Sequence, residues 1–146
     1  MNIRSFSLEQ WEEVVTLWRR AGIQLSRSDT PEGIQKKLER DPQLFLVAET
    51  EDGRIIDAVM GSYDGRRGWV NHLAVDPDCQ GQDLGTRLMQ ELEQRLAGLG
   101  CDKINLLIEP ENGAVQAFYE KQGFNRDELI FMEKWIAPAQ TAVKGV

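Results

Sequence analysis

The chain has 146 residues, of which 41% are hydrophobic and 28% charged, and its formal net charge at pH 7 is −7. This length predicts one globular domain over residues 1–136 with a frayed tail over 137–146, and no apolar run approaches the roughly 20 residues that span a bilayer. The negative charge argues against nucleic-acid binding and fits an amine-bearing partner, and the two cysteines, Cys79 and Cys101, form no metal or redox motif, which indicates free thiols in the cytoplasm.

The first third of the chain predicts a short strand over residues 3–6 and two helices. Ser7 is a typical N-cap for the first helix. The apolar residues of its inner face recur at helical spacing: Trp11, Val14, Val15 and Trp18. Thr30 and Pro31 form a start signal for the second helix, since proline is tolerated in a first helical turn.

Three neighbouring antiparallel strands follow, over residues 44–49, 54–63 and 68–75. The first is almost continuously apolar, as in a strand that is covered on both faces. An Asp-Gly pair separates each strand from the next, and this pair is a strong hairpin signal.

The second half predicts a helix, a strand, a helix and a strand. The first helix has an inner row of leucines four residues apart: Leu84, Leu88, Leu92 and Leu96. A strand over 103–109 and a helix between Asn112 and Gly123 come next, and the last strand is expected over 129–135. The fold class is therefore α/β, a mixed and mostly antiparallel sheet flanked by helices.

The turn before the leucine-rich helix predicts an anion site. Its sequence is CQGQDLGTRL, from Cys79 to Leu88, and it connects a strand to a helix. Unpaired N–H groups at the helix start and the helix dipole together favour a bound phosphate. The turn matches neither the P-loop nor the GxGxxG fingerprint, and an ordinary strand–helix connection would look the same.

Two longer segments resemble the GNAT superfamily of acyl-CoA-dependent N-acyltransferases. They are LAVDPDCQGQDLGTRLM and NLLIEPENGAVQAFYEKQGF, and the resemblance is strongest from Leu73 to Phe124. It implies the GNAT fold and transfer of an acetyl group from acetyl-CoA to a primary amine of a small molecule or peptide by direct attack. We also expect no metal, no nucleic-acid or membrane partner, and a monomer or homodimer.

The resemblance also implies which residues bind acetyl-CoA. They are Leu73, Ala74 and Val75 in the strand, Gln80, Gly81, Gln82, Asp83, Leu84, Gly85 and Thr86 in the turn, and Asn112 and Tyr119 in the later helix. Tyr119 is the implied catalytic residue, because a phenol can protonate the departing thiolate, while a backbone N–H can stabilise the oxyanion. From the residues alone, Tyr119 is also compatible with a core position and Asn112 with a simple helix cap.

Asp83 departs from the family pattern, which usually has glycine at this position of the turn. Two unit charges about 4 Å apart repel by up to roughly 4 kcal/mol at an effective dielectric near 20, and a third of that weakens binding about tenfold. Either Asp83 caps the following helix, or it points outward and only the backbone binds. The alternative function is a weak enzyme, or a binding or interaction module with an impaired cofactor turn.

Two further residues stand out, Asp57 and His72. Asp57 lies in an apolar strand where relatives often have glycine, and we expect it at an edge or paired rather than in an acceptor cleft, because a buried lone carboxylate is costly. His72 shares a strand face with Ala74, and a structural role is favoured over a catalytic one because no orienting partner is visible. Leu107 occupies the position where some relatives have a glutamate base.

The acceptor pocket is expected from the variable N-terminal third and one hairpin, because loops carry specificity. The residues concerned are Trp18, Arg27, Asp29 and the hairpin over 63–69. The sequence identifies neither the acceptor nor the general base.

Overall fold

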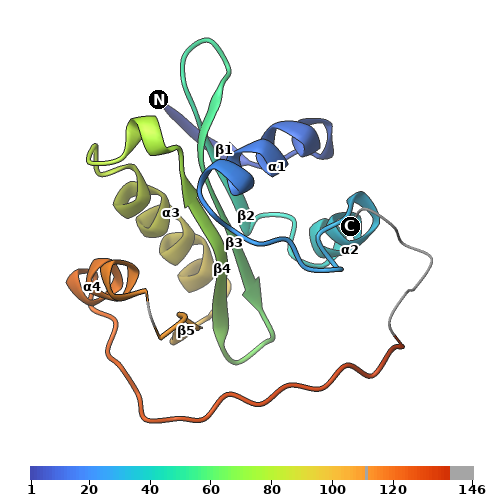
Figure 1. Cartoon of the computed structure of the whole chain (residues 1–146), viewed down its shortest axis with the longest axis vertical. Coiled ribbons are helices and arrows are strands. Elements are labelled where there is room, and N and C mark those ends of the chain that lie inside the picture. The colour runs from blue at the N-terminus through green and yellow to red at the C-terminus, as the bar shows by residue number, and fades with distance from the viewer. Residues whose placement is uncertain (111, 139–146) are drawn as a thin grey trace. The chain divides into compact units, whose positions relative to one another are not determined.

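The computed structural model describes residues 1–110 and 112–138 (Figure 1). The chain divides into two compact units, Met1–Leu107 and Ile108–Val146. Within the described residues, no helix has the length and apolar character needed to cross a membrane.

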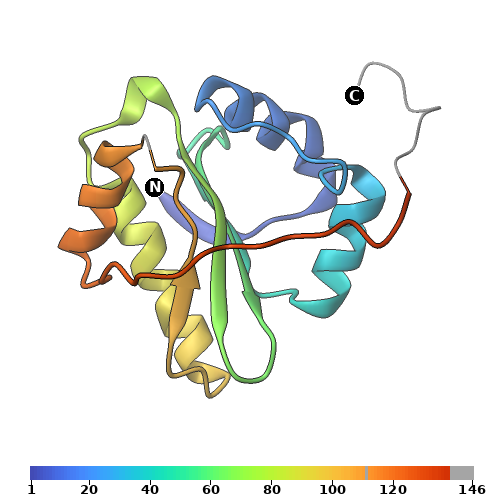
Figure 2. The same ribbon diagram turned by 60° about the horizontal axis from the view of Figure 1, so that its bottom comes forward.

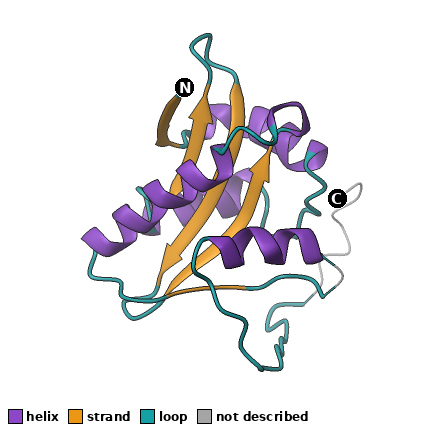
Figure 3. Ribbon diagram, turned by 90° about the vertical axis from the view of Figure 1, so that its left-hand side faces the viewer, coloured by secondary structure: helices purple, strands orange, loops and turns teal. Residues whose placement is uncertain are grey.

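The first unit contains a five-stranded sheet and three α-helices (Figure 3). Its elements in chain order are β1 (Asn2–Ser5), η1 (Leu8–Gln10), α1 (Trp11–Arg20), α2 (Pro31–Arg40), β2 (Phe45–Glu49), β3 (Ile55–Tyr63), β4 (Gly68–Val75), η2 (Pro77–Cys79), α3 (Leu84–Gly98) and β5 (Ile104–Leu106). Local signals explain the helix starts: Ser7 N–H donates to Gln10 Oε1 at 3.1 Å, and Gly33 N–H donates to Thr30 Oγ1 at 3.1 Å.

The strands lie in the order β1-β2-β3-β4-β5, and every neighbouring pair is antiparallel except β4–β5, which is parallel. The predicted Asp-Gly turns join the three central strands. Gly53 and Gly65 adopt φ values of 85° and 97°, a region that glycine enters without steric cost. The mostly antiparallel sheet that the sequence predicts is therefore confirmed.

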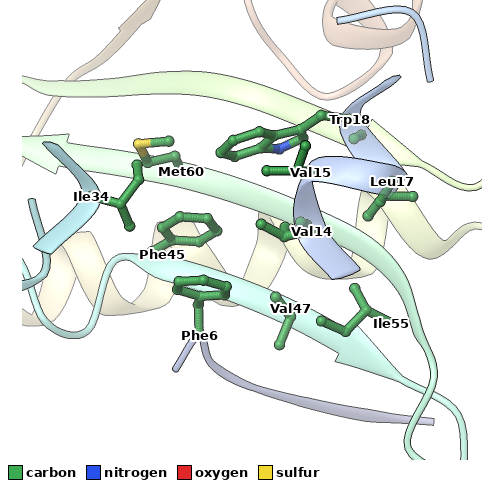
Figure 4. Packing of buried hydrophobic residues seen from close by; sticks show 12 residues of the cluster. Phe6, Val14, Val15, Leu17, Trp18, Ile34, Phe45, Val47, Ile55 and Met60 are labelled. Atoms are coloured by element: carbon green, nitrogen blue, oxygen red, sulfur yellow. The ribbon is translucent and has the colours of Figure 1, made fainter. Parts of the chain in front are cut away.

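Helices cover both faces of this sheet, with α1 and α2 on one face and α3 on the other (Figure 2). On the first face, the Phe6 and Phe45 rings stack with centroids 4.3 Å apart, next to Trp18 and Met60 (Figure 4). On the second face, a Cβ at Gly61 would lie 2.6 Å from a methyl carbon of Leu92, so glycine allows α3 to approach β3. Each fully buried apolar side chain contributes about 1.5–3 kcal/mol to folding.

The second unit contains one α-helix among its described residues, α4 (Gly113–Lys121). Asn112 Oδ1 accepts a hydrogen bond from Val115 N–H at 3.4 Å, and Gly123 ends the helix with φ 96°. Both predicted ends of this helix are confirmed.

The predicted last strand is wrong. Residues 129–135 adopt no regular secondary structure, and Ile130 is 90% exposed. A run of apolar residues becomes a strand only through a ladder with a neighbouring strand, which the run itself cannot supply. The strand predicted over 103–109 is real but shorter, Ile104–Leu106. Most of the predicted tail, 139–146, lies outside the described residues.

Candidate functional site

The candidate site of the first unit lies where β4 runs past the end of β5. The ladder between these strands pairs Gly68–Val70 with Ile104–Leu106, whereas β4 continues to Val75. Asp76 N–H donates to Ile56 O in β3 at 2.9 Å. Because N–H groups alternate between the two edges of a strand, Val75 N–H points to the edge beyond the end of β5, where an amide-bearing ligand can add like another strand.

The three predicted residues of β4 differ in what they offer to a ligand. Ala74 pairs with Ala58 and Val75 with Asp57 in the β3–β4 ladder, and Ala74 is buried. Leu73 and Val75 are half-buried. Val75 therefore combines a half-buried position with an N–H group directed away from β3.

A β-bulge interrupts β4 in the same region. Ala58 pairs with Ala74 and Met60 with Asn71, so one residue of β3 faces two of β4. His72 is one of these two residues, and its φ of 52° lies in the left-handed region. For a residue other than glycine, such a conformation costs on the order of 1–3 kcal/mol and persists only where the surrounding structure holds it.

His72 has an orienting partner, contrary to the sequence-based expectation. His72 Nε2 lies 2.8 Å from Asp29 Oδ2, and the ring meets the edge of Trp18 with centroids 4.9 Å apart. Asp29 Oδ2 also accepts hydrogen bonds from Ser26 N–H at 2.8 Å and Ser26 Oγ at 3.2 Å. Burial raises the pKa of Asp29, but the hydrogen bonds from His72 and Ser26 outweigh it and hold the pKa below its ordinary value.

The predicted anion-binding turn is exposed and leads directly into α3. Gln80, Gly81, Gln82 and Asp83 are exposed, and Gly81 has φ 86°. Arg87 N–H donates to Asp83 O at 3.0 Å as the first turn of the helix closes. The N–H groups of the three preceding residues, Leu84, Gly85 and Thr86, lie at the helix start, where they have no partner within the helix. These N–H groups can bind an anion.

Asp83 is the N-cap residue of α3, but its side chain makes no capping hydrogen bond. Its φ of 59° is left-handed, a conformation that aspartate tolerates better than most residues. The interpretation in which the carboxylate occupies the helix-start amides is therefore wrong. The carboxylate is exposed instead and leaves those amides to a ligand, while its charge stays in the turn.

The start of the turn is anchored to α1 through Asp76, which is 2% exposed. Arg20 Nη1 donates to Asp76 Oδ2 at 2.7 Å, and Arg20 Nη2 donates to Asp78 Oδ2 at 3.1 Å. Asp76 Oδ1 accepts from Asp78 N–H at 2.9 Å. Since the carboxylate is buried and bonded on both oxygens, it fixes the point at which the chain leaves β4.

Asp57 is neither at an edge nor paired, so both expectations for it are wrong. It lies on β3, the middle strand, and is 0% exposed. Neither carboxyl oxygen has a hydrogen-bond partner among the described residues. Burial raises the pKa of Asp57 to about 8, and the nearby backbone N–H of Ala58, which does not reach hydrogen-bonding geometry, opposes this rise only weakly. Asp57, Val59 and Gly61 alternate along one face of β3, the face that α3 covers.

In the second unit, Tyr119 and Asn112 occupy structural positions. Tyr119 is 6% exposed, and its ring packs against Phe118 and Phe124 with centroids 5.1 and 5.4 Å apart. Asn112 caps α4. The roles that the resemblance implies for both residues toward acetyl-CoA stay predictions.

Sequence reasoning missed the pairing of Asp29 with His72. The sequence predicts Asp29 in the acceptor pocket and His72 as a lone histidine, and 43 residues separate the two. The local signal was Ser26-x-x-Asp29, a pattern in which a side chain bonds a nearby backbone N–H. That pattern predicts an anchored carboxylate without indicating what else it contacts.

Comparison with known proteins gives a consistent family assignment. The model of the acetyltransferase (GNAT) family matches residues 9–124. An acetyltransferase of Sodalis glossinidius is 39% identical over 132 residues, which are 90% of this chain and 92% of that protein. An acetyltransferase of Pectobacterium atrosepticum is 40% identical over 134 residues, 92% of this chain and 94% of that protein.

Solved structures share the fold at lower identity. The PaiA N-acetyltransferase of Thermoplasma acidophilum, in complex with coenzyme A, has a TM-score of 0.75 and 20% identity over 88% of this chain and 92% of that chain. Glucosamine-6-phosphate N-acetyltransferase of Arabidopsis thaliana has a TM-score of 0.66 and 24% identity, covering 93% of this chain and 98% of that chain. The NatC complex bound to Gag peptide and CoA has a TM-score of 0.76 and 21% identity, covering 87% of this chain and 86% of that chain.

Proposed function

Because the chain belongs to the acetyltransferase (GNAT) family, we propose that it transfers the acetyl group of acetyl-CoA to a primary amine. The observation that carries this proposal is the arrangement in the first unit: an open edge at the end of β4 leads through a glycine-containing turn to a helix start with available N–H groups. The edge suits an amide-containing arm, and the helix start suits a pyrophosphate.

The turn fits a pyrophosphate through its backbone. Gly81 adopts φ 86°, and a Cβ there would meet no atom within 4 Å, so the backbone is open to a close ligand. The N–H groups of Leu84, Gly85 and Thr86 supply donors. Asp83 opposes the fit through its charge, and because its carboxylate does not bind these donors, the conflict is electrostatic rather than competitive.

At the other end of the proposed site, we assign to Val75 N–H a hydrogen bond to the carbonyl oxygen of the ligand, where negative charge develops during attack by an amine. Acetyl-CoA supplies an activated thioester, so the new C–N bond forms as the C–S bond breaks. The amine then loses a proton and the departing sulfur gains one. We assign the second proton transfer to the Tyr119 hydroxyl, on the basis of the family resemblance.

The acceptor is an amine on a small molecule or a peptide. Among the structural neighbours, one is named for glucosamine-6-phosphate and another is bound to a peptide, so this fold is compatible with both classes. The net charge of −7 favours a positively charged acceptor. We further propose that the protein acts in the cytoplasm as a monomer or homodimer, without a metal.

Calorimetric titration with acetyl-CoA tests the cofactor site, and two matched glycine variants make the test specific. Gly81 and Gly53 have φ values of 86° and 85°, and a Cβ at either would meet no atom within 4 Å. Gly81→Ala and Gly53→Ala therefore introduce the same backbone strain, but only Gly81 lies in the proposed cofactor-binding turn before α3. We expect only Gly81→Ala to weaken acetyl-CoA binding, and equal affinities for the two variants would contradict the assignment of the turn.

A screen of primary amines for release of the CoA thiol tests the reaction. For the best amine, Tyr119→Phe should lower kcat by about a hundredfold while leaving acetyl-CoA affinity unchanged, because a general acid is needed only as the thiolate leaves. An unchanged kcat would remove Tyr119 from the mechanism and support the core role that its packing against Phe118 and Phe124 indicates.

The exposed charge of Asp83 in the turn favours one alternative, a weak enzyme or a binding module. Acetyl-CoA at about 100 times its dissociation constant adds about 2.7 kcal/mol to the stability of a protein that binds it. The absence of any thermal stabilisation at millimolar acetyl-CoA would favour the binding module.

A further inference from the structure

We infer that His72, oriented by Asp29, is the general base that accepts a proton from the acceptor amine. The inference rests on the proposed function and adds to it the proton acceptor that neither the family resemblance nor the comparisons supply. Leu107 occupies the position of a glutamate base in some relatives, and it is 60% exposed and carries no ionisable group.

The backbone at His72 is strained in a way that points to function. His72 lies in the bulge of β4, in the segment that runs past the end of β5, with φ 52°. Bulges re-aim side chains and are over-represented next to active sites. A left-handed residue other than glycine persists only where surrounding contacts hold it, and here the contacts with Asp29 and Trp18 hold the ring.

The hydrogen bond to Asp29 determines which ring nitrogen can accept a proton. An ionised carboxylate only accepts hydrogen bonds, so the neutral ring carries its hydrogen on Nε2 and donates it to Asp29 Oδ2 over 2.8 Å. Nδ1 then presents its lone pair. No residue within the described part of the chain hydrogen bonds to Nδ1, so this nitrogen is available to an amine. A neighbouring carboxylate both orients the ring and stabilises the imidazolium that forms.

The surroundings of the ring combine access with a single negative charge. The His72 side chain is 23% exposed, whereas that of Asp29 is 6% exposed. The loop between α1 and α2 contributes Asp29, to which the neutral Ser26 donates, and α1 contributes Trp18. Asp29 is the charged group among these described contacts. Its charge is retained near neutral pH because its pKa lies below the ordinary value, the hydrogen bonds from His72 and Ser26 outweighing the effect of burial.

The proposed step is balanced. The amine lone pair forms the C–N bond with the acetyl carbonyl carbon, the C–S bond breaks, and its electron pair leaves with the CoA sulfur. Nδ1 takes one proton from the amine nitrogen, so the product amide is neutral. The imidazolium is paired with Asp29 until it loses the proton to solvent.

Nuclear magnetic resonance can test the positioning of His72 without any activity assay. The chain contains one histidine, so ¹⁵N-histidine labelling of a protein with a histidine-free tag gives the ring signals of His72 alone. At alkaline pH we expect the Nε2–H tautomer in the native chain and a mixture of tautomers in Asp29→Asn. Asp41→Asn is the matched control, because the Asp41 side chain is as little exposed as that of Asp29 and is ion-paired with Lys37 at 2.8 Å, so this variant should keep the native tautomer.

Kinetics with the best amine of the screen test the base itself. His72→Gln should lower kcat/KM at pH 7 by about a hundredfold and remove the acidic limb of the pH profile, with acetyl-CoA affinity unchanged. Asp29→Asn should lower kcat/KM by about tenfold or more. Asp41→Asn should retain the native rate and the acidic limb of the pH profile. Thermal unfolding of each variant checks that it is folded. Added imidazole should partly restore His72→Ala.

The outcomes separate this inference from the proposed function. One outcome is that the native chain transfers acetyl groups while His72→Gln keeps the native rate and the acidic limb of the pH profile. It would overturn the assignment of His72 as the general base and leave the proposed function intact. A native Nδ1–H tautomer would also overturn it, whatever the variants do. Failure of the native chain to bind acetyl-CoA or to acetylate any amine would overturn both.

Discussion

Two aspartates with little-exposed side chains, on opposite sides of the sheet, show how differently one folded chain treats the same chemical group. Asp29 lies on the side of α1 and α2, and three hydrogen bonds converge on its Oδ2 from His72 and Ser26. Asp57 lies on the side of α3, is 0% exposed, and has no partner for either oxygen among the described residues. The pKa of Asp29 is held below its ordinary value, because its hydrogen bonds outweigh the effect of burial, whereas burial raises that of Asp57 to about 8.

Burial alone therefore does not decide the charge of a carboxyl group. Desolvation raises the pKa of both groups, and only hydrogen bonds to the ionised form reverse it. A satisfied carboxylate can orient a functional neighbour, whereas an unsatisfied one is neutral near pH 7 and opposes folding as the pH rises.

The largest expected effect on stability comes from removing the Asp57 carboxyl group, which has no hydrogen-bond partner among the described residues. Below the ordinary value of 3.8, Asp57 is protonated in both states; between 3.8 and about 8 only the unfolded chain ionises it, so stability falls as pH rises. In the native chain this loss amounts to about 1.4 kcal/mol per pH unit. Asp57→Ala should therefore raise the free energy of unfolding by about 4 kcal/mol at pH 7 and flatten the dependence of stability on pH. Urea unfolding from pH 4 to 8 measures both.

Val59→Ala is the control for Asp57→Ala, because Val59 lies on the same face of β3 and is also 0% exposed. It should destabilise the chain at every pH and keep the native slope. A slope in Asp57→Ala that matches the native one would mean that the Asp57 carboxyl has partners in solution.

Replacing the hydrogen-bonded Asp29 should have the opposite effect on the free energy of unfolding. Asp29→Asn should lower the free energy of unfolding by about 1–3 kcal/mol at neutral pH, since it weakens charge-assisted hydrogen bonds. The folded pKa of Asp29 lies below its ordinary value of 3.8, because its hydrogen bonds outweigh burial. Its stabilisation is therefore present above 3.8 and is lost as the pH falls through the folded value. Urea unfolding at pH 7 and pH 3 should show the variant approaching the native chain in acid, and a constant difference would contradict the assignment.

Asp83 extends the comparison to an exposed carboxylate and has the smallest expected effect on stability. Asp83→Gly should raise the free energy of unfolding by about 1 kcal/mol, since glycine accepts φ 59° without strain and no capping hydrogen bond is lost. It should also tighten acetyl-CoA binding by about tenfold at low salt, and by less at high salt, because screening weakens the repulsion.

Asp83→Asn separates the effect of replacing Asp83 on stability from its effect on acetyl-CoA binding. Asparagine removes the charge and keeps a side chain that tolerates the left-handed region. It should tighten acetyl-CoA binding without the gain in stability. Calorimetry at two salt concentrations tests this, and equal affinities for the native chain and both variants at low salt would show that the Asp83 carboxylate lies away from the phosphates.

Local patterns predicted most elements of this fold. The strand over 68–75 has the predicted bounds, α2 begins after Thr30 as expected, and both Asp-Gly turns contain a left-handed glycine. Each of these features depends on residues close together in sequence, such as a cap, a turn or a repeating apolar face. The apolar run over 129–135 had no such support, and its expected strand is absent.

The site divides in the same way. The glycine-containing turn, the helix start and the family resemblance were all present in the sequence, and the family is confirmed. The conformation of Asp83 was not, because a residue can cap a helix or turn outward with the same neighbours. The choice depends on backbone dihedrals, which the surrounding turn imposes.

The order of helices and strands up to α4 and the position of the proposed cofactor turn follow from the sequence alone, since both depend on local hydrogen bonding and periodicity. The family follows from the resemblance of two sequence segments, which the family match confirms. Only the tertiary structure decided that His72 meets Asp29, 43 residues away, and that Asp57 is buried in the middle strand without a partner. Those outcomes depend on which segments the sheet brings together. Burial and hydrogen bonding are properties of that packing, and they determine the charge of each carboxyl group.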